Sequence, residues 1–119
     1  MHGLRDEDLI FDALTFPLGS GQEDLRKSGL NTINAIKEIK RILPKCKTIL
    51  GISNSSFGLS PHIRHVLNSV FLHFAVEAGL DMVIVHAGKI MPLYKIDETG
   101  RELCRKLIFD ERKFEEVVN

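Results

Sequence analysis

The sequence predicts an α/β protein built on a parallel sheet. Short apolar runs alternate with longer segments in which apolar residues recur at helical spacing. The alternation occurs three times, in strand-helix units near 8–43, 47–79 and 81–109, followed by a tail over 110–119. Strands in this order pair in parallel through right-handed crossovers. Because three strands leave two sheet edges without backbone partners, the chain reads as consecutive units of a larger sheet or barrel.

The first unit begins with the apolar run 9–11, which has no polar face and therefore suits a strand covered on both sides. Pro and Gly mark 15–22 as a loop. A helix is expected over 23–43, with acidic residues in its first turn, where they meet the positive end of the helix dipole. Gly29 predicts a bend or break in the middle of this helix. Pro44 cannot continue it.

The second unit has its strand at 48–52 and its loop at 53–59. Ser60 and Pro61 are typical of an N-cap and a first helical residue. The helix carries apolar residues at regular spacing until Gly79, which is typical of a left-handed C-cap.

The third unit has its strand at 80–85 and a connecting segment at 86–94. A last helix is expected over 97–109, where apolar residues again recur at helical spacing.

Composition excludes several functional classes. Sixteen basic and sixteen acidic residues cancel, so no charge excess predicts binding to nucleic acid or an anionic membrane surface. No apolar run reaches the length of a membrane span, and the N-terminus does not resemble a signal peptide, so a cytoplasmic location is expected. Cys46 and Cys104 fit no metal spacing and are expected to be reduced thiols.

Polar side chains follow all three predicted strands. Asp12 ends the first strand, and its alternative role is to cap the following loop. Asn54 lies in the loop after the second strand; an amide both donates and accepts, so it can bond a ring nitrogen in either protonation state. Its alternative is an ordinary Asx-turn. His86 ends the third strand, either as a ligand contact or as a loop histidine. Because ligands bind at the carboxyl ends of parallel strands, these groups predict one shared pocket.

The helix after the second loop carries further candidates. Arg64 lies in its first turns, with a solvated helix face as the alternative. His62, His65 and His73 share the helix, but no additional ligand is suitably spaced, so no metal site is expected.

Four segments together resemble the pterin-binding domain of cobalamin-dependent methionine synthase. The resemblance covers about residues 4–112, and its most specific parts are 9–22, 50–59, 66–72 and 75–85. It implies that the chain is a partial pterin-binding domain over 1–119, made of the last three βα units of a (β/α)8 TIM-type barrel. Such a piece is incomplete as a barrel on its own.

The resemblance also implies roles for individual residues. Asp12 matches an aspartate that bonds the pterin ring, and Ser53 and Asn54 match a Ser-Asn pair after the next strand. Asn54 is the expected catalytic residue, because that asparagine approaches N5, the atom that carries the methyl group. Arg64 matches an arginine that borders the site. His86 departs from the family pattern, which has an asparagine there.

The implied function is a segment of a methyltransferase. It would bind methyltetrahydrofolate as substrate and pass the methyl group to cob(I)alamin in methionine synthesis, with cobalamin held by another domain or protein. The isolated chain is expected to be inactive.

The alternative is a truncated, non-catalytic remnant or binding module. It would need a partner that supplies the missing strands, either an N-terminal barrel half or a second copy of itself. A dihydropteroate synthase-like activity is disfavoured, because that family's phosphate-binding motif has no match near Ser53 and Asn54.

Overall fold

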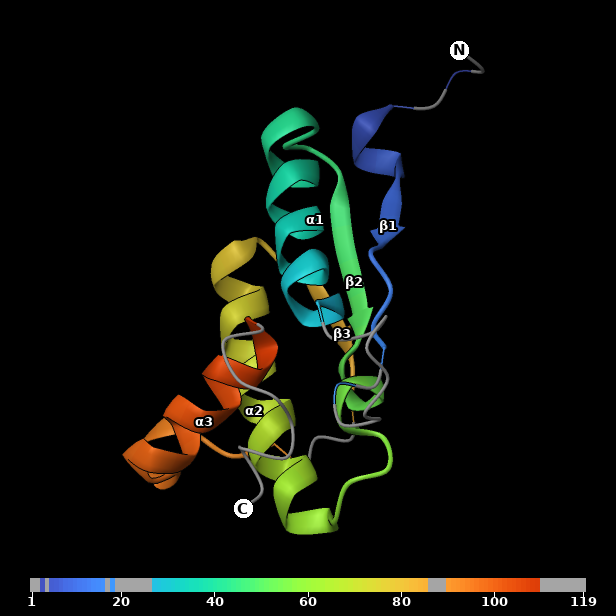
Figure 1. Cartoon of the computed structure of the whole chain (residues 1–119). Coiled ribbons are helices and arrows are strands. Elements are labelled where there is room, and N and C mark those ends of the chain that lie inside the picture. The colour runs from blue at the N-terminus through green and yellow to red at the C-terminus, as the bar shows by residue number, and fades with distance from the viewer. Residues whose placement is uncertain (1–2, 4, 17, 19–26, 86–89, 110–119) are drawn as a thin grey trace.

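The computed structural model describes residues 3, 5–16, 18, 27–85 and 90–109. Its three strands form one parallel sheet in the order β1-β2-β3, as the sequence predicts, and the sheet is open (Figure 1). The strands are β1 (Ile10–Asp12), β2 (Lys47–Gly51) and β3 (Met82–Ile84). The helices are α1 (Ser28–Ile42), α2 (Pro61–Ala78) and α3 (Glu98–Ile108), with short 3-10 turns η1 (Asp6–Asp8), η3 (Ile52–Ser56) and η5 (Leu93–Lys95).

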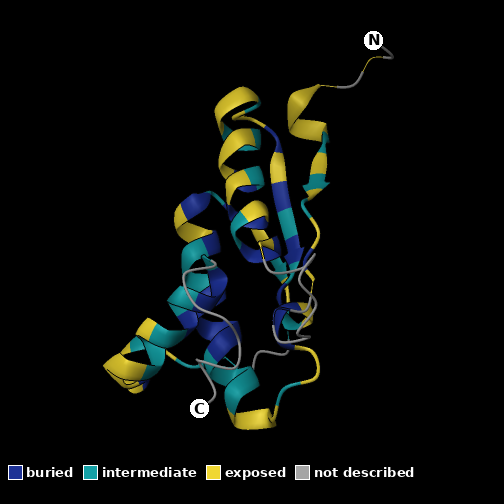
Figure 2. Ribbon diagram, viewed as in Figure 1, coloured by how far each residue is buried: buried dark blue, intermediate teal, exposed yellow. Residues whose placement is uncertain are grey.

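The helices lie on one side of the sheet (Figure 1). α1 contacts α2, and both contact α3. The buried side chains gather between this helical layer and β2 (Figure 2). In this core Leu50 of β2, Ile33 and Ile36 of α1 and Phe71 of α2 are all at most 1% exposed. None of the helices in the described residues is long and apolar enough to cross a bilayer.

No described helix or strand covers the other face of the sheet, here called the bare face, and this fits the expectation of an incomplete barrel whose interior is uncovered. The register pairs Asp12 with Ile49 and Gly51 with Ile84, which places these residues on a common face. On this face Ile10 is 59% exposed and Ile84 is 65% exposed. The strands lack a polar face because the sheet needs a layer on each side. The described helices supply only one of these two layers.

The predicted end signals agree with the described helices. Pro61 is the first residue of α2, and Gly79 ends that helix with φ +119°. Asp97, which was not among the predicted caps, caps α3 by accepting a hydrogen bond from the Gly100 N–H at 2.7 Å. These signals are local in sequence, and the structure uses them where they occur.

Gly29 has a different role from the one expected. It is the second residue of α1 rather than a weak point in the middle, and the acidic residues near 23 lie outside the described residues. A Cβ atom at Gly29 would lie 2.7 Å from the carbonyl oxygen of Ile108. Glycine is therefore needed here because the start of α1 approaches the end of α3 closely.

The amino-terminal end of the sheet is joined by a polar cluster. Lys40 of α1 donates hydrogen bonds to the Asp81 carboxylate at 3.0 Å and to the Cys46 carbonyl at 2.9 Å. The same carboxylate accepts from the Thr48 N–H at 2.9 Å. Burial raises the pKa of Asp81, but the hydrogen bonds from Lys40 and Thr48 lower it more, so it lies below its ordinary value.

Both cysteines are free and buried, as reduced thiols would be. Burial raises the pKa of Cys104 to about 11 and also raises that of Cys46. Neither thiol is therefore primed as a nucleophile at neutral pH.

We expect Asp81→Asn to lower the free energy of unfolding at pH 7 by about 1 kcal/mol, a value discounted for the partial exposure of the pair. Because the folded-state pKa of Asp81 is the lowered one, its stabilisation is present above the ordinary aspartate pKa and is lost as the pH falls through the folded-state pKa. Urea unfolding should show the difference at pH 7 and a smaller one near pH 2, below the ordinary pKa of an aspartate. Glu38→Gln, in an exposed pair with Arg41, is the control and should change stability little. An equal loss at both pH values would contradict the assignment.

We expect Gly29→Ala to destabilise the protein by about 1–3 kcal/mol, although alanine is the better helix former. The added methyl group meets the Ile108 backbone oxygen, which cannot rotate away as a side chain does. Chemical denaturation measures the loss. Gly51→Ala is the control, since a Cβ atom there meets nothing within 4 Å. A Gly29→Ala protein as stable as wild type would disprove the close approach.

Candidate functional site

The carboxyl ends of the three parallel strands meet at one edge of the sheet, beside η3 (Figure 1). Asp12 is the last residue of β1, and η3 begins directly after β2. His86 follows β3 but lies outside the described residues. The structure therefore brings together the groups after β1 and β2, and the predicted role of His86 stays a prediction.

Asp12 makes the loop-capping contact. Its Oδ1 accepts a hydrogen bond from the Leu14 N–H at 2.8 Å. This bond holds Leu14 at φ 65°, a left-handed conformation that is costly for a non-glycine residue. The Leu14 carbonyl in turn accepts from the Thr32 hydroxyl at 2.8 Å, which fixes the loop to α1. Asp12 is exposed, and within the described residues only its Oδ1 is engaged, so Oδ2 remains open to a ligand.

Asn54 reaches across to the loop after β1. Its Nδ2 donates to the Thr15 carbonyl at 2.7 Å, a bond between residues 39 positions apart. The side chain thus joins two loops instead of closing an Asx-turn on its own backbone. The donor half of the amide is used, whereas Oδ1 has no partner among the described residues. Asn54 is exposed and can offer this oxygen as an acceptor.

Arg64 points at the η3 backbone. Its Nη2 donates to the Ser53 carbonyl at 3.0 Å, and its Nε donates to the Ser56 hydroxyl at 3.1 Å. The solvated-face alternative is therefore wrong, because the side chain is half-buried and bonded to η3. Ser53 is half-buried and contributes its carbonyl to this contact. Contacts of Arg64 and Ser53 with a ligand remain predictions.

Two residues near the site were not among the sequence candidates. Thr15 is buried and supplies the carbonyl that Asn54 bonds, and its Oγ1 has no hydrogen-bond partner among the described residues. Ser56 is also buried and bonds Asn68, which is 0% exposed. No local pattern marks these residues, because their contacts come from other elements. The sequence signal that could have pointed to this cluster is Asn68, an uncharged polar residue among the apolar residues of the α2 segment.

The histidines of α2 do not form a metal centre. His73 pairs with Glu77 through Nε2 at 3.1 Å, one helical turn away. Across the part of the chain that the structure describes, no three His, Cys, Asp or Glu side chains come together as a metal site.

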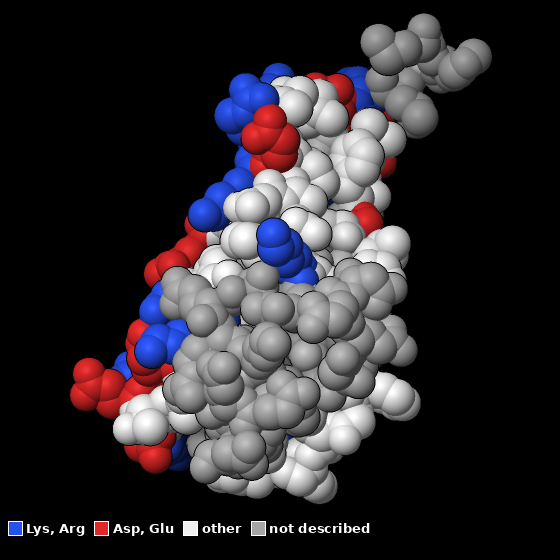
Figure 3. Space-filling view, viewed as in Figure 1, with Lys and Arg blue, Asp and Glu red and all other residues white. Residues whose placement is uncertain are grey.

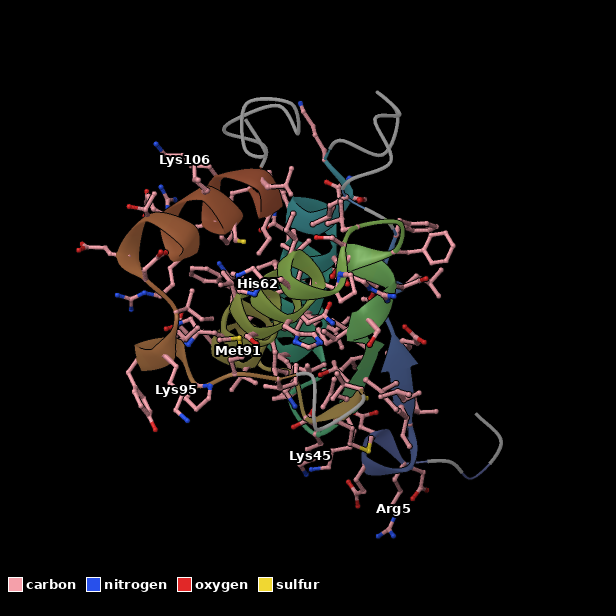
Figure 4. All side chains as sticks on the ribbon, turned by 90° about the horizontal axis from the view of Figure 1, so that it is seen from below. Arg5, Lys45, His62, Met91, Lys95 and Lys106 are labelled. Atoms are coloured by element: carbon pink, nitrogen blue, oxygen red, sulfur yellow. The ribbon has the colours of Figure 1, made fainter. Side chains whose placement is uncertain are left out.

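Two hollows lined by described residues lie away from the strand ends. One of about 480 Å³ is formed by α2, η5 and α3, and His62, Met91 and Lys95 surround it (Figure 4). Another of about 280 Å³ lies between α2 and α3. Neither is lined by Asp12 or Asn54. The polar groups at the strand ends therefore face an open surface with no opposing wall in the described residues.

On the face shown in Figure 3, charges of one sign do not gather over the described residues. Acidic and basic side chains are interspersed along the helical side of the molecule (Figure 3). Several form exposed pairs within one helix, including Glu38 with Arg41 and Glu102 with Arg105. Such pairs contribute little energy and leave no strong field of one sign.

Comparison with known proteins identifies the relatives of this arrangement. Residues 1–86 match the family described as pterin binding enzyme. The chain is 49% identical over 111 residues to a methionine synthase of Mycobacterium tuberculosis, and 50% identical over 111 residues to one of Mycobacterium leprae. Each match covers 93% of this chain and 9% of the relative. The predicted resemblance is therefore confirmed, and the chain spans about a tenth of the length of these relatives.

Proposed function

The chain belongs to the pterin binding enzyme family, and on that premise we propose that it forms one side of a methyltetrahydrofolate site. The observation that carries the proposal is the position of Asn54, whose Oδ1 is open at the end of β2 while its Nδ2 is held by Thr15. Asp12 ends the neighbouring strand with Oδ2 open. An amide oxygen and a carboxylate oxygen at one sheet edge suit the N–H groups of a pterin ring.

The proposed chemistry follows from this arrangement. Asp12 would accept hydrogen bonds from the pterin ring and fix its orientation. Asn54 would lie near N5 and present its Oδ1 to the proton that N5 gains as the methyl group leaves. A hydrogen bond that forms or strengthens as N5 gains this proton stabilises the transition state more than the substrate. The methyl acceptor would be cob(I)alamin, held by another domain or protein in the cytoplasm. Ser53, Arg64 and His86 complete the proposed substrate-binding set.

The proposed architecture is the last three βα units of a (β/α)8 barrel. An open parallel sheet with helices on one face and a bare apolar face supports it. In a closed barrel that bare face is interior and is filled by side chains from the other strands. Residues 1–119 would then be a partial pterin-binding domain, inactive in isolation because a site needs all its contacts to converge.

The second candidate is a non-catalytic remnant or binding module, favoured by the same bare face. Ile10 and Ile84 are both more than half exposed, although each is a strong strand former. Such a surface needs a cover, either an N-terminal barrel half or a second copy of this chain.

We expect the isolated chain to bind methyltetrahydrofolate weakly or not at all by calorimetry, because the opposing wall is absent from the described residues. Weak binding is better located by NMR titration at millimolar ligand. The shifts should fall on Asp12, Ser53 and Asn54, and Asn54→Ala should weaken the apparent affinity by up to about 10-fold, as loss of one neutral hydrogen bond predicts.

Asn34→Ala is the matched control for that titration, since Asn34 is an exposed amide on α1 away from the strand ends. It should leave the shifts unchanged. Shifts concentrated around His62 and Lys95, or equal effects of the two substitutions, would contradict the proposed site. Tight, saturable binding that Asn54→Ala abolishes would show that the isolated chain already holds a working half-site.

If a second copy covers the bare face, Ile84→Glu should reduce self-association measured by sedimentation velocity, because a charge there opposes burial. Val76→Glu is the control, since Val76 is 56% exposed but lies on α2. Wild-type protein that stays monomeric at high concentration would exclude self-association and leave a different partner as the cover.

A further inference from the structure

We propose that Arg64 is a positioning residue, which sets the turn that carries Asn54 by holding Ser53 and Ser56. This inference rests on the proposed function, because it assigns Arg64 a role in the same site. It replaces direct recognition of the ligand as the main task of Arg64. Arg64 acts on Asn54 through η3, the short turn between β2 and α2.

The contacts of Arg64 bracket Asn54. Nη2 donates to the carbonyl of Ser53, the residue before Asn54, and Nε donates to the hydroxyl of Ser56, two residues after it. The distances are 3.0 Å and 3.1 Å, both within the ordinary range for such bonds. One rigid guanidinium therefore fixes both sides of the segment from which the Asn54 side chain projects.

A second layer fixes the Ser56 hydroxyl itself. Ser56 Oγ lies 2.7 Å from Asn68 Oδ1 and 3.1 Å from the Ser53 carbonyl, and a hydroxyl has one proton to donate. The shorter contact makes Asn68 the better acceptor, while Ser56 accepts from Arg64. Ser56 and Asn68 are both 0% exposed, so water does not compete for these bonds. Arg64 and Asn68 lie one turn apart on α2, and both bond η3 through the buried hydroxyl of Ser56.

These bonds act on Asn54 by fixing the η3 backbone from which its side chain projects. The Asn54 carbonyl accepts from the Phe57 N–H at 3.3 Å, and the Ser55 carbonyl accepts from the Leu18 N–H at 2.9 Å. The first bond closes η3 on itself, whereas the second, with the bond from Asn54 Nδ2 to Thr15, connects η3 to the segment after β1. If Arg64 released η3, the Asn54 amide would lose its fixed direction, and its Oδ1 would no longer point at one place.

Arginine suits this role better than lysine. A guanidinium offers several N–H donors in a fixed fork, whereas an ammonium is a point charge on a flexible stem. Arg64→Lys keeps the positive charge but cannot reproduce both bonds at once. If Arg64 acted only through its charge on the ligand, that substitution would be nearly neutral.

The experiment compares Arg64→Lys and Ser56→Ala in the full chain, without ligand, by amide hydrogen exchange and by NMR of the Asn54 side-chain amide. We expect exchange at Leu18 and Phe57 to become about tenfold faster or more, the change that corresponds to about 1.4 kcal/mol. The Asn54 side-chain resonances should shift in both variants. Ser56→Ala is informative because it leaves Arg64 and its charge in place.

The readouts separate positioning from a general structural role. Amides in the middle of α1 should exchange as in wild type, because the loss is confined to η3 and its contacts. Arg41→Lys is the matched control, since Arg41 also makes two bonds, to Glu38, on an exposed part of α1. It should leave Asn54 and Leu18 unchanged.

Unchanged Asn54 resonances in both variants would overturn the proposal, as would faster exchange spread evenly over the whole chain. A subsequent methyltetrahydrofolate titration keeps the two ideas apart. If the wild-type folate shifts concentrate around His62 and Lys95 while the variants still loosen η3, the proposed function fails and the positioning role stands. If wild type binds and Ser56→Ala binds equally well with η3 unchanged, the positioning role fails alone.

Discussion

The packing of β2 against α1 and α2 is the contact on which the other elements depend. Leu50 lies in one apolar cluster with Ile36 of α1 and Phe71 of α2, and all three are fully buried. Each such side chain contributes about 1.5–3 kcal/mol relative to an exposed position. β1 and β3 then pair with the two edges of β2, and this pairing holds both strands in the sheet. Since the strands are parallel, this packing also brings their carboxyl ends to one edge.

Packing on one face stabilises the sheet, and the described residues leave its other face uncovered. Alternate residues of β2, Thr48 and Leu50, face the helices and are buried, while Ile10 and Ile84 on the neighbouring strands face away and are exposed. The polar cluster of Lys40 and Asp81 fixes the opposite end of the sheet from the candidate site. The polar cluster and the candidate site therefore lie at opposite ends of the same strands, an arrangement typical of barrels.

The candidate site is held by tertiary contacts rather than by the sheet alone. Asn54 bonds Thr15 from the preceding unit, and Arg64 holds η3 from the following helix. Each contact crosses from one βα unit to another or from a loop to its helix. Among the described residues, Asn54 Oδ1 and Asp12 Oδ2 have no partner, while Asn54 Nδ2 and Asp12 Oδ1 are engaged. A pre-set acceptor of this kind does not need to reorganise as charge develops on a ligand.

The sequence by itself determined the elements whose signals are local. Pro61 and Gly79 bound α2, Asp97 caps α3, and the three apolar runs became the three strands. It also placed Asp12 and Asn54 at strand ends, because a residue that follows a parallel strand must emerge at the carboxyl edge.

Tertiary structure decided what those residues touch. The Asn54 bond to Thr15 spans 39 positions, and the close approach of Gly29 to Ile108 joins distant parts of the chain. The same holds for the bare face: an apolar run shows that a strand needs covering, but not which elements supply the cover. Local patterns encode backbone conformation within a few residues, whereas partners are chosen by packing between segments that the sequence does not order in space.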